Sequence, residues 1–184
     1  MNFLDSLVLP QSTERIELLH YMLMLILFLF IPFISIVFGG TLLSLLYKRQ
    51  GLRHNNDVQL KFAKDIIEIV TINKGTGVIL GIVPLLTTII IFAQLLHKAE
   101  VMTVGLLSFS LLLEVVALIL IYTYRYSLSF NKIFHSIHKA NLSDPSVDDD
   151  IKKLSRGTLN LSAKAGKYGF LFLFASMWLF VSGV

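Results

Sequence analysis

The chain has 184 residues, of which 55% are hydrophobic and 15% are charged, and it contains no cysteine. A soluble domain carries about a quarter charged residues, so this composition excludes an ordinary soluble domain and indicates several membrane spans. The lack of cysteine excludes disulfides, iron–sulfur clusters and thiol catalysis. The formal charge of +4 comes from basic residues beside the apolar runs, which favours anionic lipid over nucleic acid as a partner.

The first apolar run extends from His20 to Tyr47 and is expected to be the first span. Residues 1–20 lack the basic start of a signal peptide, so this span is predicted to stay in the protein. Ser12 and the acidic residues that follow it predict a helix start just before the span. Pro32 is expected to kink the helix.

A basic connector from Lys48 to Asn56 follows, with Gly51 as its turn, and then an amphipathic helix from Asp57 to Val70. Apolar residues recur at helical spacing on one face of this helix: Val58, Phe62, Ile66 and Ile69. We expect this face to lie along the membrane surface and the helix to lead into a second span, Ile72 to Leu96. Gly77 and Gly81 in that span form a small-residue motif for close helix packing.

The third apolar run, Val101 to Tyr124, carries a single formal charge, Glu114. A helix of this length crosses a bilayer, and Glu114 lies roughly 18 Å along its axis, near mid-membrane. An ionised Glu that faces lipid there costs at least a few kcal/mol. Glu114 is therefore expected to face the protein interior, on one small or polar stripe with Thr103, Ser110 and Ala117.

The residues after Tyr124 predict a polar segment that contains a surface helix, a turn at Ser143 to Pro145 and an acidic triplet at Asp148 to Asp150. The apolar face of that surface helix is Phe130, Ile133, Phe134 and Ile137. A short fourth span is expected from near Tyr168 to Val184. Because no polar tail follows it, we expect the chain to be a fragment or a subunit that another polypeptide continues.

Lys and Arg gather in two segments, Lys48–Glu68 and Arg125–Lys167. The positive-inside rule therefore places both segments in the cytoplasm and both termini outside. The sequence predicts one transmembrane domain over residues 1–184, an all-α integral membrane helix bundle with four transmembrane helices and cytoplasmic amphipathic segments. The expected location is the inner (cytoplasmic) membrane.

Glu114 is the strongest functional candidate, as a proton-relay carboxyl or a quinol hydrogen-bond acceptor. The alternative is a structural hydrogen bond to a serine or threonine on a neighbouring helix. His20 and His97 lie at the outer ends of the first two spans, where they could hold a haem b between them or simply cap the helix ends.

His135 and His138 are three residues apart on the predicted surface helix, where they could bind a quinone headgroup or a metal. The alternative is a solvated helix face beside anionic lipid. His54 is expected only to help set topology, within its basic loop. No nucleotide-binding, zinc or serine-nucleophile motif is present in the sequence.

The order of these features resembles the N-terminal part of cytochrome bd quinol oxidase subunit I, over the first 130 residues. The shared features are Ile31-Pro32-Phe33, Lys61-Phe62, Asn73 followed by Gly77-Val78 and Gly81, and Leu111 to Glu114. The family's haem-ligating histidine has no counterpart in Leu25 to Ile31, and Leu106 stands where the family has a second acid. The resemblance therefore implies a shared helical scaffold with Glu114 on a proton path.

Three classes of function are expected. The first is a membrane subunit of a respiratory or photosynthetic electron-transfer complex that seats quinone or haem and anchors extrinsic redox subunits. The second is a proton-conducting or transporter subunit, with Glu114 and Thr88 lining the path. The third is a structural subunit held together by its glycine and serine seams.

Overall fold

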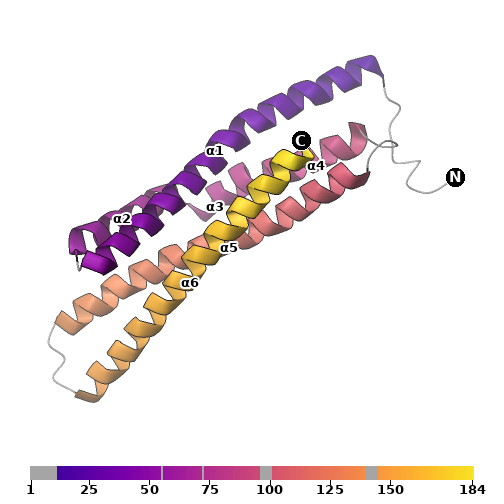
Figure 1. The fold of residues 1–184 in the computed structure, drawn as a ribbon. Coiled ribbons are helices and arrows are strands. Elements are labelled where there is room, and N and C mark those ends of the chain that lie inside the picture. Colours follow the sequence, from indigo (N-terminus) through magenta and orange to yellow (C-terminus); the bar gives the residue numbers. More distant parts are fainter. Residues whose placement is uncertain (1–11, 55, 72, 96–100, 140–144) are drawn as a thin grey trace.

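The computed structural model describes residues 12–54, 56–71, 73–95, 101–139 and 145–184. These residues form an elongated bundle of helices without a strand (Figure 1). The elements in chain order are α1 (Thr13–His54), α2 (Asp57–Val70), α3 (Lys74–Gly77), the π-helical turn η2 (Val78–Ile82), α4 (Val83–Leu95), α5 (Val101–Lys139) and α6 (Pro145–Gly183).

Four helical segments are long and apolar enough to cross a membrane, which confirms the predicted all-α bundle with four candidate spans. They are Thr13–His54, Lys74–Leu95, Met102–Phe130 and Lys153–Gly183. The start of α1 and the end of α6 lie at the same end of the bundle (Figure 1). The end of α6 contacts the interior of α1, where the Phe30 and Phe180 ring centroids are 5.0 Å apart.

Helix α1 begins where the sequence predicts, since the Arg15 amide donates to the Ser12 hydroxyl. It runs as one helix through Pro32 and Gly51, so the predicted turn at Gly51 is wrong. Gly51 is buried against α2, and a Cβ there would lie 2.9 Å from the Leu60 side chain. The glycine therefore serves the close approach of two helices, and α1 ends only at His54.

Helix α2 runs antiparallel to α1, because Gly51 meets Leu60 and the Ser44 hydroxyl donates to the Ala63 carbonyl at 2.6 Å. Ala63 and Ile67 form its buried face. The apolar face that the sequence predicts for the membrane surface is on the outside of the bundle, where Val58 is 74% exposed. The expectation that α2 lies along the membrane surface is corrected accordingly: α2 packs lengthwise on α1 and extends the bundle.

The second span is divided into α3, η2 and α4, which the sequence did not predict. Asn73 caps α3, its side chain accepting a hydrogen bond from the Gly75 amide. The π-helical turn η2 follows directly and contains the buried Gly81. A single π-turn within an α-helix often marks a functional site, because it changes the direction of the side chains that follow.

Helices α5 and α6 are 39 residues each and lie side by side in antiparallel directions (Figure 1). The Ser110 and Ser176 hydroxyls each donate to the other residue's carbonyl at 2.9 Å. The polar segment predicted over residues 125–167 is mostly the continuation of these two helices, because α5 extends to Lys139 and α6 begins at Pro145. A separate surface helix is therefore a wrong prediction, although those residues are helical.

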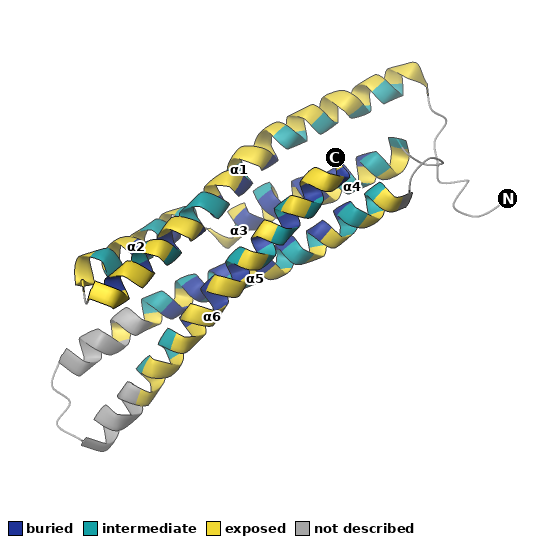
Figure 2. Cartoon of the chain, viewed as in Figure 1, coloured by how far each residue is buried: buried dark blue, intermediate teal, exposed yellow. Residues whose placement is uncertain are grey.

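Buried residues lie along the centre of the bundle and exposed ones on its outer surface, most visibly on the N-terminal half of α1 (Figure 2). That outer surface is apolar: Tyr21 is 71% exposed and Phe28 is 77% exposed. Soluble proteins rarely expose contiguous apolar surface of this kind. The distribution suits helices that are surrounded by acyl chains.

Candidate functional site: the buried acid Glu114 and a polar column

Glu114 of α5 faces the interior of the bundle. Its side chain is 1% exposed, and its Oε1 atom has no hydrogen-bond partner among the described residues. Oε1 lies 3.1 Å from the position that a Cβ on Gly81 would take. The same position is 3.3 Å from the Phe33 ring and 3.4 Å from Leu118, so the carboxyl sits between η2, α1 and its own helix. The predicted inward orientation is confirmed.

The Gly77–Gly81 pair makes room for polar side chains of α5. A Cβ on Gly77 would lie 2.8 Å from the Tyr122 hydroxyl, just as a Cβ on Gly81 would crowd Glu114. The small-residue spacing by itself predicts only close helix packing for this motif. In the structure the glycines allow the backbone to approach one tyrosine and one buried acid, which a larger residue would push aside.

The predicted stripe on α5 is buried at Ser110, Glu114 and Ala117, as expected. Thr103, one end of the stripe, is half-buried. The four-residue spacing from Ser110 to Glu114 places the two on the same helix face, one turn apart. Ser110 bonds to Ser176 of α6, whereas Glu114 Oε1 has no partner among the described residues, so this face holds one satisfied and one unsatisfied polar group.

A column of buried polar side chains continues from this region between α1, α5 and α6. Ser44 of α1 lies 3.0 Å, hydroxyl to hydroxyl, from Tyr124 of α5. The Lys48 ammonium donates to the Ser162 hydroxyl of α6 at 2.6 Å and lies 5.1 Å from the centroid of the Tyr124 ring. These contacts join the three helices at one level of the bundle.

Thr41 lies between this level and Glu114. Helices α1 and α5 run parallel, because Phe33 is beside Glu114 and Ser44 is beside Tyr124. Tyr124 is therefore about 15 Å from Glu114 along the axis, at 1.5 Å per residue. Thr41 is fully buried, and its hydroxyl also lacks a hydrogen-bond partner in the described parts of the chain. Along the bundle axis, Glu114 is therefore followed by Thr41 and then by the Ser44–Tyr124 and Lys48–Ser162 pairs.

Lys48 is the residue that the sequence analysis missed. It was assigned to a basic connector, whereas in the structure it lies within α1 and is 5% exposed. The three- and four-residue spacing of Thr41, Ser44 and Lys48 places them on one helix face. That spacing was the available signal, but a lysine after an apolar run is more often at the membrane boundary.

Thr88 of α4, predicted to line a path with Glu114, is buried, and its hydroxyl donates to the Pro84 carbonyl of its own helix at 2.9 Å. Among the described residues, no hydrogen bond joins Thr88 to Glu114 Oε1.

The histidines do not form a site within the described chain. His20 is exposed, and its Nδ1 is 2.9 Å from the Ile16 carbonyl oxygen of its own helix. His97 lies outside the described residues, so the predicted haem pair stays a prediction. The same holds for His135 and His138, whose side chains are outside the description. His54 is exposed at the end of α1. Among the side chains that are described, no three metal-ligating groups gather.

Neither a protein-family model, nor a curated protein, nor a solved structure matches this chain. The resemblance to cytochrome bd subunit I therefore stays a prediction from the sequence.

Proposed function

We propose that this chain is an integral membrane protein in which Glu114 takes up and releases protons, as part of a proton-conducting assembly. The observation that carries the proposal is the carboxyl itself, which is 1% exposed and has an Oε1 atom without a described partner. Burial without a partner disfavours a fixed charge, and ionisable groups within membrane spans usually mark ion or proton pathways.

The polar column supports access to Glu114 from one end of the bundle. Thr41, the Ser44–Tyr124 pair and the Lys48–Ser162 pair follow one another along α1 toward the end of the bundle where α2 lies. The positive-inside rule assigns this end to the cytoplasm. Hydroxyl groups both donate and accept hydrogen bonds, which suits them to pass protons with water molecules between them.

The test is proton flux into liposomes that contain the purified full chain and a trapped pH-sensitive dye, driven by a potassium diffusion potential. We expect flux above that of protein-free liposomes, and we expect Glu114→Gln to abolish it because the amide cannot release a proton. Glu17→Gln is the matched control, since Glu17 is an exposed acid near the start of α1. Equal flux in Glu114→Gln and wild type, or no flux in the wild type, would contradict the proposal.

A second candidate is the electron-transfer role, in which the chain seats quinone or haem b and anchors redox subunits of a respiratory or photosynthetic complex. Its specific support is that two elements of the bd resemblance, the Gly77–Gly81 element and the Leu111–Glu114 element, contact each other at Gly81 and Glu114. An optical spectrum of protein purified from native membranes tests this role, together with quinone analysis of an organic extract. A preparation with neither a Soret band nor quinone would remove it.

A further inference from the structure

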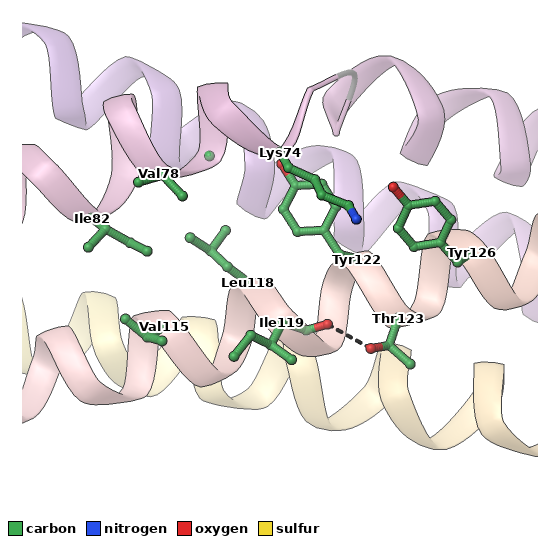
Figure 3. Close-up of a pocket in the computed structure, with 10 residues that line it drawn as sticks. Lys74, Val78, Ile82, Val115, Leu118, Ile119, Tyr122, Thr123 and Tyr126 are labelled. Atoms are coloured by element: carbon green, nitrogen blue, oxygen red, sulfur yellow. Dashed lines mark hydrogen bonds between the residues drawn. The ribbon is translucent and has the colours of Figure 1, made fainter.

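A groove of about 370 Å³ lies between α5 and the α3–η2 segment (Figure 3). Most of its wall is apolar, formed by Val78, Ile82, Val115, Leu118 and Ile119. Val78 is 47% exposed and Ile119 is 61% exposed, so the groove opens on the outer surface of the bundle, where acyl chains surround the spans.

One end of the groove is polar and aromatic. Figure 3 shows the Lys74 amine close to the rings of Tyr122 and Tyr126, and the amine is 5.0 Å from the Tyr126 centroid. The Tyr122 hydroxyl donates to the Asn73 carbonyl at 2.8 Å, which holds its ring at the start of α3. The guanidinium carbon of Arg125 lies 5.6 Å from the centroid of the same Tyr126 ring.

Two cationic side chains, Lys74 and Arg125, lie at this end of the groove. Arg125 donates to the Thr71 carbonyl and acts electrostatically on Glu68. The Glu68 carboxylate is already paired with Lys64 at 3.2 Å. Lys74 makes no ion pair with any residue that the structure describes. Its positive charge therefore stands beside two tyrosines at the end of a membrane span, where lipid headgroups are found.

We propose that this groove binds an anionic phospholipid, with the phosphate at Lys74 and one acyl chain along Val78, Ile82 and Ile119. Charge complementarity supports the headgroup position, since lysines beside spans attract anionic lipid. Ile82 is eight residues after Lys74, which corresponds to about 12 Å along the helix axis, a distance over which an acyl chain can run in contact with the groove. Glu114 does not line the groove, so the lipid site does not depend on the proposed proton function.

Native mass spectrometry of the full chain in detergent tests the proposal, with phosphatidylglycerol and phosphatidylcholine of identical acyl chains as probes. We expect the wild type to retain one phosphatidylglycerol preferentially. Lys74→Gln should lower that retention about five-fold, the loss expected for one lysine near an anionic surface. Lys61→Gln is the matched control, because Lys61 is an exposed lysine of α2 outside the groove and should retain wild-type binding.

The acyl-chain part of the proposal has its own variant. Ile119→Trp places a bulky ring in the open side of the groove and should lower retention of both lipids, whereas Met102→Trp, at a lipid-facing position 77% exposed, should not. Equal retention of the two lipids by the wild type, or unchanged binding in Lys74→Gln, would overturn the assignment. Displacement of the lipid by excess inorganic phosphate would also overturn it, because it would indicate a bare anion site.

Discussion

Ser110 and Glu114 are buried polar residues one helical turn apart on α5, and they differ in whether their side chains are hydrogen-bonded. Ser110 exchanges hydrogen bonds with Ser176 of α6, and both hydroxyls are satisfied. Glu114 is as deeply buried, but its Oε1 finds no described donor. A satisfied polar pair holds two helices in register, whereas an unsatisfied acid costs stability and is retained for another reason. The contrast separates the structural part of the stripe from the part that is available for chemistry.

The largest expected effect on stability comes from filling the space at Gly81, next to the Glu114 carboxyl. Gly81→Leu would place a side chain where Glu114 Oε1, Phe33 and Leu118 already lie, and we expect a loss of about 1–3 kcal/mol from overpacking. Gly105→Leu is the control, since nothing lies within 4 Å of a Cβ there. Thermal unfolding in detergent measures both. Equal midpoints for the two variants would show that Gly81 does not hold Glu114 in place.

The next variant removes the unsatisfied group itself. Glu114→Leu is expected to raise the free energy of unfolding by about 1 kcal/mol, because an apolar side chain needs no hydrogen bond in the interior. The same variant should lose proton flux. If Glu114 is retained for its chemistry, Glu114→Leu should be more stable than the wild type and should conduct fewer protons. A destabilised variant would instead indicate that Glu114 has a structural partner.

Ser110→Ala tests the other buried polar residue of this comparison, the one that is hydrogen-bonded. It removes the hydrogen bond that the Ser110 hydroxyl donates to the Ser176 carbonyl. Interhelical hydrogen bonds in membranes average about 0.6 kcal/mol, so the expected loss of stability is of that size. Proton flux should not change. Guanidinium or thermal unfolding monitored by circular dichroism gives the first quantity, and the liposome assay gives the second. A large loss of flux in this variant would place Ser110 on the proton route.

The smallest expected effect concerns an acid outside the spans. Burial acts to raise the pKa of Glu68, but the hydrogen bond from Ser129 at 3.0 Å and the ion pair with Lys64 outweigh it and hold the pKa below the ordinary value of 4.5. Because the folded-state pKa is lowered, the stabilisation is present at neutral pH and is lost as the pH falls below 4.5 and through the folded value.

We therefore expect the unfolding midpoint to decline on the acid side, and Glu68→Gln to remove a small part of that decline. Surface ion pairs contribute little, so the difference should stay within about 1 kcal/mol. Asp57→Asn, at an exposed acid of the same helix, is the control. An identical acid decline in wild type and Glu68→Gln would contradict the stabilising role of these contacts.

The features that the sequence predicts correctly are those whose alternatives carry a large free-energy cost. A charge in lipid is expensive, so the inward direction of Glu114 and the small stripe around it follow from residue types alone. Length and hydropathy likewise define four helices, because only long apolar helices satisfy every backbone group within a bilayer. These are one-dimensional properties that neighbouring helices do not alter.

Other features depend on which helix faces pack against each other. Residue types do not determine those faces, because lipid and the protein interior are equally apolar. The buried face of α2 contains the small Ala63, because α1 comes close there, and the larger Val58 stays outside. Lys48 is buried only because Ser162 and Tyr124 arrive from two other helices. The close approach of Glu114 to Gly81 and the groove at Lys74 likewise form where α5 packs against the second span. The sequence by itself determined the number of candidate spans and the buried position of Glu114, whereas the tertiary structure alone decided what surrounds that acid.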